Sequence, residues 1–193
     1  MRVVAGTSRG TPLRAPKGSD VRPTTDRIKE AMFAPLQFGL SGAAVLDVFG
    51  GTGALGLEAA SRGAARVVII EKARAAQSAI RANIAACGSP GSVELLTMPW
   101  TRAFARLETQ GLRFDYVFVD PPYRSGQYAP VLAALRSHHL LAEGALVVLE
   151  SDTELPHEET GYTWERTRRY GSIYVTWMVP AEREERPAGS GPC

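Results

Sequence analysis

Four consecutive residues, Asp120–Tyr123, place a carboxylate, two prolines and an aromatic ring directly after the apolar run 114–119. A buried strand has no use for a carboxylate at its end, and a turn needs at most one proline. An exocyclic amine on a planar base is a poor nucleophile, because its lone pair is delocalised into the ring. A site can assist it by accepting its N–H hydrogens. Asp120 and a backbone carbonyl, best that of Pro121, therefore predict a clamp for such an amine.

The other two residues of this segment fit the same chemistry. Pro122 fixes a second φ angle and so stiffens the loop that holds the carbonyl. Tyr123 offers a ring on which an extruded base can stack. The expected reaction is the transfer of a group to an amine that the site positions. The alternative interpretation is an accidental Asp-Pro-Pro turn.

A second chemical motif is the glycine-rich stretch 46–64, which reads LDVFGGTGALGLEAASRGA. Gly51, Gly53 and Gly56 satisfy the pattern G-x-G-x-x-G between a predicted strand and a predicted helix, a geometry that binds polar cofactor groups at a helix N-terminus. Glu71 lies 20 residues after Gly51, which suits a carboxylate that binds ribose hydroxyls. The pattern alone also fits a dinucleotide, and Gly56 alone fits close packing of a helix on a strand.

Asp47 distinguishes between the two cofactor classes. It precedes the glycines at the end of the predicted strand. A pyrophosphate is anionic, so a carboxylate that points into the loop would repel it. S-adenosylmethionine has a cationic sulfonium and a cationic amino group, which a carboxylate attracts. Asp47, the glycine loop and Glu71 together favour S-adenosylmethionine over a nicotinamide dinucleotide.

The elements that must position these residues follow from the alternation of apolar runs and helical patterns. Such alternation predicts βαβ crossovers and a parallel sheet covered by helices on both faces. The runs 162–170 and 172–180, separated only by Gly171, predict a final antiparallel hairpin. The predicted strands before that hairpin are 43–49, 65–71, 92–97, 114–120 and 144–150, and the predicted helices are 54–63, 73–88, 101–108 and 128–141.

Two further pieces precede the first of these strands. Residues 2–15 predict a small β-hairpin around Thr7–Gly10. The segment RPTTDRIKEAMFAPL predicts a helix with Thr24 or Thr25 as its N-cap, which Pro35 should end or kink. We expect an N-terminal extension over residues 1–40, one domain over residues 41–180 and a disordered, charged tail over residues 181–193.

The composition narrows the class of protein. The chain has 193 residues, of which 45% are apolar and 22% charged, as expected for one soluble globular domain. No apolar run approaches the ~20 residues of a membrane span, and no secretory signal is visible. Cys87 and Cys193 make no disulfide framework, and the three histidines fit no metal-ligand spacing. We expect a reduced, cytoplasmic protein without a metal.

Charge is distributed unevenly. The net charge is only +2, but residues 1–30 hold seven basic and three acidic side chains, a local excess of +4. A basic N-terminal arm is typical of proteins that bind nucleic acid, and it is equally typical of a solubilising surface.

Taken together, these motifs resemble a known family. The segment DPPY following LDVFGGTGALGLEAASRGA resembles the amino-group N-methyltransferases, and RVVAGTSRGTPL with RPTTDRIKEAMF narrows the resemblance to the RsmD-like family over about residues 2–179. The resemblance implies a class I methyltransferase fold: a Rossmann-like, seven-stranded α/β sheet, mostly parallel, with a C-terminal antiparallel hairpin and a small N-terminal β-hairpin extension. It implies methylation of N2 of one guanine in 16S ribosomal RNA, in a small ribosomal subunit or a late assembly intermediate, by a monomer.

The resemblance also suggests roles for individual residues. The catalytic residues would be Asp120, Pro121, Pro122 and Tyr123. The cofactor contacts would be Asp47, Phe49, Gly50, Gly51, Thr52, Gly53, Glu71, Lys72 and Trp100. The substrate contacts would be Arg9, Arg22, Thr24, Asp26 and Arg27, although helix capping is an equal explanation for Thr24 and Asp26.

The chain departs from the family pattern in two places. Relatives usually show D-x-F-A-G-S-G, where this chain has Gly50 for the alanine and Thr52 for the serine. After the third strand they tend to carry a polar residue that can bind adenine. Here the segment reads TMPWTRAF, so Trp100 is a candidate for the adenine face and equally a core tryptophan.

Several alternatives stay open on the sequence alone. The amine could instead be adenine N6 in RNA or DNA, or a protein Gln or Asn side chain. Two others are a dinucleotide-dependent oxidoreductase and a non-catalytic RNA-binding protein. No segment is large enough for the separate target-recognition region of DNA amino-methyltransferases, which favours a structured RNA as the substrate.

Overall fold

The computed structural model describes residues 1–16, 25–88, 91–122, 125–155 and 161–181. Its helices are α1 (Asp26–Phe33), the 3-10 helix η1 (Ala34–Leu36), α2 (Ala54–Ser61), α3 (Arg74–Ala86), α4 (Trp100–Thr109) and α5 (Tyr128–Ser137). Its strands are β1 (Ala44–Asp47), β2 (Arg66–Ile70), β3 (Val93–Leu96), β4 (Phe114–Val119), β5 (Leu141–Ser151), β6 (Tyr162–Tyr170) and β7 (Ile173–Pro180).

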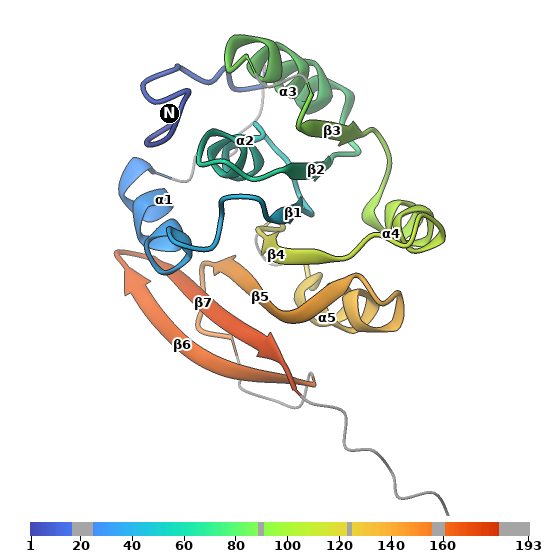
Figure 1. Ribbon diagram of the computed structural model, residues 1–193. Coiled ribbons are helices and arrows are strands. Elements are labelled where there is room, and N and C mark those ends of the chain that lie inside the picture. The colour runs from blue at the N-terminus through green and yellow to red at the C-terminus, as the bar shows by residue number, and fades with distance from the viewer. Residues whose placement is uncertain (17–24, 89–90, 123–124, 156–160, 182–193) are drawn as a thin grey trace, which may run out of the picture.

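All seven strands form one twisted sheet in the order β3-β2-β1-β4-β5-β7-β6 (Figure 1). The five strands β1 to β5 run parallel, and β7 pairs antiparallel with both β5 and β6. The predicted class I methyltransferase sheet and its terminal hairpin are therefore confirmed. The strand order reverses direction at β1, whose neighbours are β2 and β4, and ligands of open α/β sheets bind at such a point.

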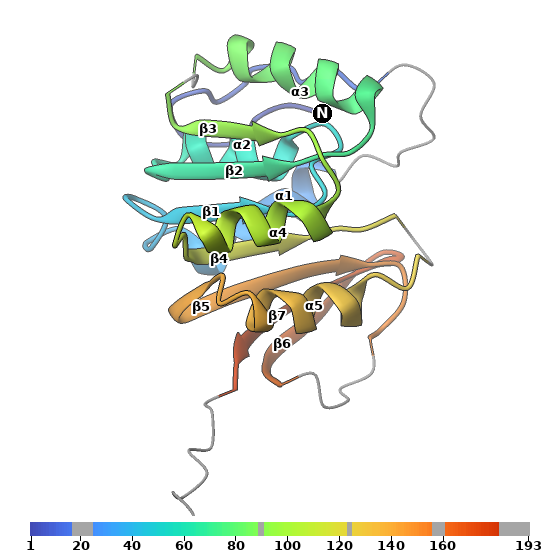
Figure 2. The same cartoon turned by 90° about the vertical axis from the view of Figure 1, so that its right-hand side faces the viewer.

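Helices cover both faces of the sheet and create two cores (Figures 1 and 2). One core holds side chains of α1, α2 and α3, among them Met32, Leu57 and Ile80. The other holds side chains of α4 and α5, among them Phe104 and Leu135. Because both faces are covered, β2 reads as the continuous apolar run Val67–Ile70, which is buried throughout.

The predicted helix forms as α1, and the structure shows how it begins and how it ends. Thr25 is the N-cap, and its Oγ1 accepts the Ile28 N–H at 3.4 Å. Thr24 lies outside the described residues. The α-helix ends at Phe33 and tightens into η1, where Pro35 occupies the start of the 3-10 turn. The expected effect of this proline is confirmed.

The N-terminal strand-like runs make less regular structure than a full hairpin. A single antiparallel bridge joins Arg2 to Pro12, and backbone hydrogen bonds link Val3 with Thr11 and Gly10. The chain therefore reverses direction around Thr7–Gly10 as predicted, but only one bridge of a ladder forms.

A buried carboxylate attaches this N-terminal segment to the rest of the protein. Glu58 of α2 is fully buried and accepts the Val4 N–H at 2.7 Å and the Ala5 N–H at 2.9 Å. It also pairs with the buried Lys29 of α1 at 3.3 Å and with Arg62 at 2.9 Å. The Lys29 ammonium donates in addition to the Arg2 carbonyl. One carboxylate thus joins the N-terminal segment, α1 and α2.

The second half of the sheet differs from prediction at one boundary. Helix α5 ends at Ser137, and β5 already begins at Leu141, three residues before the predicted strand. His139 between them has φ 51°, a left-handed conformation that stops the helix. Val3, Leu13 and Met32 belong to the same core as residues of α2 and the sheet. The domain boundary expected at residue 40 stays a prediction.

Candidate active site

The motif residues converge where the parallel strands end. Asp47 of β1 is paired with Phe118 of β4, so Asp120 lies level with Phe49, just before the glycine loop. On the other side of β1, the Glu71 N–H donates to the Leu96 carbonyl at 3.0 Å. The three carboxylates of the predicted site and the glycine loop therefore lie at one edge of the sheet, the right-hand edge in Figure 2.

The glycine loop has the conformation that its sequence requires. Gly51 has φ 55° and Gly53 has φ 78°, both in the left-handed region that favours glycine. A Cβ atom on Gly50 would lie 2.5 Å from a methyl carbon of Ile69, and one on Gly56 would lie 2.7 Å from Ile69 Cγ1. Gly56 therefore serves close helix–strand packing, as the alternative interpretation held.

Asp47 lies beneath this loop and is only 1% exposed. Its Oδ2 accepts the Gly56 N–H at 3.1 Å, which ties β1 to the first turn of α2. The backbone N–H of Phe49 also acts to lower the pKa of this carboxylate. Within the described part of the chain, Oδ1 is buried without a hydrogen-bond partner.

This environment changes the chemistry of Asp47. Burial, followed by the nearby negative charge of Glu71, raises the pKa of Asp47 from its ordinary 3.8 to about 7, against the opposing backbone N–H groups of Gly56 and Phe49. A cation beside the carboxylate would restore its ionised form.

Glu71 closes the loop from the β2 side. Its Oε2 accepts the Gly51 N–H at 2.8 Å, and its Oε1 accepts the Ala73 N–H at 2.7 Å. In dinucleotide folds the loop amides face a pyrophosphate. Here the Gly51 N–H is already hydrogen-bonded to the Glu71 carboxylate, and a second carboxylate, that of Asp47, lies beneath the loop. This electrostatic arrangement disfavours a pyrophosphate.

The residues predicted to bind the acceptor amine, which begin with Asp120–Pro122, follow β4 directly. Asp120 is half-buried, Pro121 is buried and Pro122 is exposed. The Pro122 carbonyl accepts the Ser125 N–H at 3.2 Å, so the chain turns back at once toward α5. Tyr123 lies outside the described residues, and its predicted stacking role stays a prediction.

Trp100 connects the β3 side of this edge with the start of α5. It is half-buried at the start of α4, and its Nε1–H donates to Gln127 Oε1 at 2.9 Å. Its ring packs on Phe104 with the centroids 5.2 Å apart. Phe49 and Trp100 both border the core cluster on the α4–α5 face. Trp100 is therefore neither a fully buried core residue nor a free surface residue, and Lys72 beside Glu71 is exposed.

The N-terminal segment is linked to the glycine loop directly, by the Thr52 hydroxyl that donates to Met1 Sδ at 3.7 Å, and through the side chain of Asn83. Asn83 of α3 is buried, accepts the Arg14 N–H at 2.8 Å and donates to the Arg14 carbonyl at 3.0 Å. The same amide donates to the Thr52 carbonyl at 2.9 Å. Thr52, which stands where relatives usually have serine, is buried and packs inside the loop.

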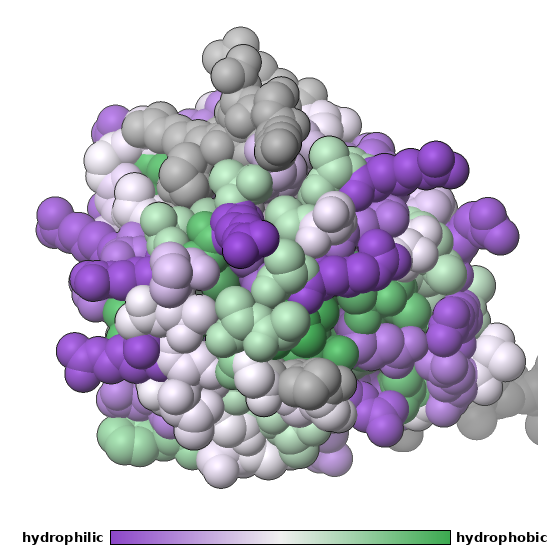
Figure 3. Space-filling model, turned by 90° about the horizontal axis from the view of Figure 1, so that it is seen from above, coloured by the Kyte–Doolittle hydropathy of each residue, from purple (hydrophilic) through white to green (hydrophobic). Residues whose placement is uncertain are grey.

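Of the predicted substrate residues, Arg9 lies toward the opposite end of the sheet, because its neighbour Ser8 bonds to Ser61 and Cys87 at the C-terminal ends of α2 and α3. Arg9 and Arg27 are exposed, and Asp26 pairs with Arg2 at 3.0 Å. Arg22 and Thr24 lie outside the described residues. Exposed residues of the N-terminal segment and α3 include Arg9, Arg14, Arg74 and Arg81, and strongly hydrophilic side chains project from this side of the molecule (Figure 3).

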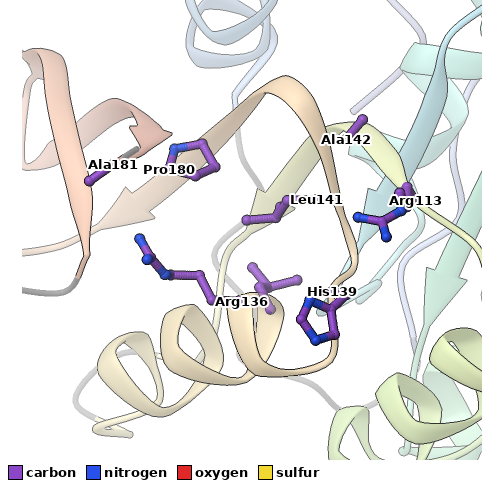
Figure 4. Close-up of a pocket in the computed structure, with 8 residues that line it drawn as sticks. Arg113, Arg136, His139, Leu141, Ala142, Pro180 and Ala181 are labelled. Atoms are coloured by element: carbon purple, nitrogen blue, oxygen red, sulfur yellow. The ribbon is translucent and has the colours of Figure 1, made fainter. Parts of the chain in front are cut away.

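An open hollow at the opposite end of the sheet is distinct from this site. Its lining includes Arg113, which precedes β4, Leu141 at the start of β5, and Arg136 and His139 near the end of α5 (Figure 4). These residues lie at the amino ends of the parallel strands. No motif residue that the structure describes lines the hollow. Among the described residues, no group of three or more His, Cys, Asp and Glu could hold a metal, and no helix could span a bilayer.

Comparison with known proteins decides the family. A family model described as Conserved hypothetical protein 95 matches residues 1–179. Ribosomal RNA small subunit methyltransferase D of Escherichia coli strain K12 is 35% identical over 187 residues, which cover 95% of this chain and 92% of that protein. The chain belongs to the ribosomal RNA small subunit methyltransferase D family.

Solved structures agree with this family assignment. The structure described as putative methyltransferase yhhF from Escherichia coli is 34% identical, with a TM-score of 0.81 over 94% of this chain and 98% of that one. The structure of a putative methyltransferase complexed with SAH is 15% identical, with a TM-score of 0.59 over 76% of this chain and 48% of that one. At that identity it shows the fold alone.

Sequence reasoning missed three buried residues of this family member, one that supports the glycine loop and two that attach the N-terminal segment. Asn83, Glu58 and Lys29 are polar or charged side chains on buried helix faces. A signal for Asn83 was present, because it follows Ala76 and Ile80 at helical spacing on the face that packs inward. Nothing in the sequence indicated that Lys29 and Glu58 pair, because 29 residues separate them.

Proposed function

We propose that this protein transfers the methyl group of S-adenosylmethionine to N2 of a specific guanine in 16S ribosomal RNA. The observation that carries the proposal is the glycine loop flanked by two carboxylates, Asp47 and Glu71, at the same sheet edge as Asp120–Pro122. The named relatives support ribosomal RNA of the small subunit as the substrate class.

The residues at the loop fit this cofactor. Asp47 Oδ1 is buried without a described partner, and the raised pKa of Asp47 favours a neighbouring cation. The cationic amino and sulfonium groups of S-adenosylmethionine meet both requirements, and bound there it supplies an electrophilic methyl group. Glu71 at the end of β2 would accept the ribose hydroxyls. Phe49, Lys72 and Trp100 stand as further candidate contacts.

Asp120 and Pro121 would act on the acceptor. The Asp120 carboxylate and the Pro121 carbonyl accept the two hydrogens of the guanine amine, which directs its lone pair toward the methyl group. Two consecutive prolines restrict the backbone that holds this carbonyl. These two groups would contribute by holding the amine in a fixed geometry relative to the methyl group. Tyr123 would stack on the extruded base.

The substrate would be approached from the N-terminal side. Arg9, Arg22, Asp26, Arg27 and Thr24 are the proposed contacts of the N-terminal extension. We propose the assembled small subunit or a late assembly intermediate as the particle, a monomer as the active form and the cytoplasm as the compartment. A structured particle supplies the specificity that a bare catalytic domain lacks.

Labelled cofactor tests the proposal directly. Small ribosomal subunits from a strain without its own copy of this enzyme would be incubated with labelled S-adenosylmethionine, and the RNA digested to nucleosides. Label in N2-methylguanosine is the expected result. Label in N6-methyladenosine, or in a protein Gln or Asn, would replace the guanine assignment with another amine. No label with cofactor binding intact would overturn the ribosomal substrate.

A further inference from the structure

Strand β6 carries a basic cluster that the proposed chemistry does not use. Arg166, Arg168 and Arg169 are exposed on this strand, which lies at the end of the sheet order and pairs on one side only among the strands that the structure describes. Among the described residues, none of the three forms a salt bridge with a carboxylate. A structural role for such charges is to prevent edge-to-edge pairing of strands. The position of these arginines in the sheet also indicates a role in binding.

The strand registers place this cluster at the edge that holds the acceptor site. Val119 of β4 pairs with Leu149 of β5, Glu150 pairs with Val175 of β7, and Val175 pairs with Arg168 of β6. Asp120 and Arg168 therefore belong to one row across the sheet. Three strand spacings separate them, or about 14 Å. Arg169 belongs to the next row toward the carboxyl edge, because it pairs with Tyr174.

Neighbouring aromatic rings hold the guanidinium groups of Arg166 and Arg169, and the hairpin turn also holds that of Arg169. The Arg166 guanidinium lies 4.5 Å from the centre of the Trp177 ring, and that of Arg169 lies 5.5 Å from the centre of the Tyr174 ring. Arg169 Nε also donates to the Gly171 carbonyl at 2.8 Å. Groups held in this way lose less conformational freedom when they bind a ligand. Their remaining N–H donors are available for an anion.

We propose that the end of the β6–β7 hairpin, through Arg168 and Arg169, binds phosphates of the ribosomal RNA strand that flanks the target nucleotide. The inference rests on the proposed function, since it places the target base at Asp120. A guanidinium fork matches a phosphate in shape and charge. A strand that enters the site at Asp120 and runs along β5 and β7 would reach these arginines within a few nucleotides. The basic N-terminal arm would then contact the opposite side of the same RNA.

The double variant Arg168→Gln/Arg169→Gln tests this surface. Its control is Arg66→Gln/Arg113→Gln, which removes the same charge from exposed arginines at the amino end of the sheet. Binding to 16S ribosomal RNA and to small subunits would be measured at several salt concentrations, with steady-state methylation alongside. We expect the KM for RNA to rise about tenfold, kcat to stay within about twofold, and the slope of log K against log salt to shrink by roughly 1.4. The control should change none of these by more than twofold.

Two checks separate a binding defect from a folding defect. Cofactor affinity and the midpoint of thermal unfolding should match the wild type. Arg168→Lys/Arg169→Lys keeps both charges and should retain most of the salt slope. An unchanged slope and KM in the glutamine variant would overturn the inference, and so would an equal loss in the control pair. A defect with subunits but not with RNA would assign the surface to a ribosomal protein and overturn the phosphate contact. Wild-type protein that methylates no RNA would instead refute the proposed function.

Discussion

The substitution Asp47→Asn should separate stability from cofactor binding in a pH-dependent way. Asp47 is buried beneath the glycine loop, and burial raises its pKa from 3.8 to about 7. Between these values the folded protein holds a proton that the unfolded chain has released. Folding is therefore disfavoured progressively as the pH rises through this window. Above pH 7 the penalty is complete.

The magnitude follows from the two pKa values. At 1.36 kcal/mol per pKa unit, the difference between 3.8 and about 7 amounts to roughly 4 kcal/mol. Of this, about 3 kcal/mol develops between pH 5 and pH 8. Asparagine keeps the shape of the side chain and a carbonyl acceptor for the Gly56 N–H, but carries no charge. The variant should therefore gain stability relative to the wild type by about 3 kcal/mol over this interval.

Cofactor binding should change in the opposite direction. The ionised Asp47 attracts a cationic ligand, so wild-type affinity for S-adenosylmethionine should increase from pH 5 to pH 8. The variant lacks this carboxylate, and its affinity should be weaker at pH 8 and nearly independent of pH. A charge removed from a functional position thus stabilises the protein and impairs the site.

Urea denaturation without cofactor, at pH 5, 6, 7 and 8, would measure the first effect, and isothermal titration calorimetry the second. Glu94→Gln, which removes an exposed carboxylate, controls for the loss of one charge. A stability difference between Asp47→Asn and wild type that does not vary with pH would refute the argument from burial. Unchanged cofactor affinity at pH 8 would refute the assignment of Asp47 to the cofactor.

Three further substitutions test other parts of the site. Asp120→Ala should keep cofactor affinity and lose at least about a hundredfold in methyl transfer, because positioning of the amine is lost; turnover assays showing wild-type rates would contradict the clamp. Glu71→Ala should weaken S-adenosylmethionine binding about tenfold or more, as judged by calorimetry, since the ribose acceptor and the Gly51 amide's partner disappear together; an unchanged Kd would place the ribose contact elsewhere. Glu58→Gln should destabilise the fold by about 3 kcal/mol, because the fully buried Lys29 loses its counter-charge. Lys29→Met should cost less in the same urea denaturation experiment, since Glu58 keeps Arg62 and two backbone N–H donors, and the reverse order would disprove this account.

The sequence by itself determined the order of elements and the location of the site. Continuous apolar runs such as Val67–Ile70 mark strands buried on both faces. Only Gly171 separates the runs 162–170 and 172–180, and so short a link requires an antiparallel hairpin. Residues that follow parallel strands lie at one edge of the sheet, so the sequence alone implies that Asp47, Glu71 and Asp120 lie near one another. Local chemistry and chain connectivity suffice for these conclusions.

Only the tertiary structure decided which groups share an environment. The pairing of Lys29 with Glu58 and the bridge from Asn83 to Thr52 join residues that are distant in sequence, and no local pattern encodes them. The raised pKa of Asp47 depends on how completely the loop excludes water, which is a property of packing. The level at which Arg168 lies relative to Asp120 depends on three strand registers. Registers are fixed by side-chain packing across the whole sheet, and a single run of residues cannot specify them.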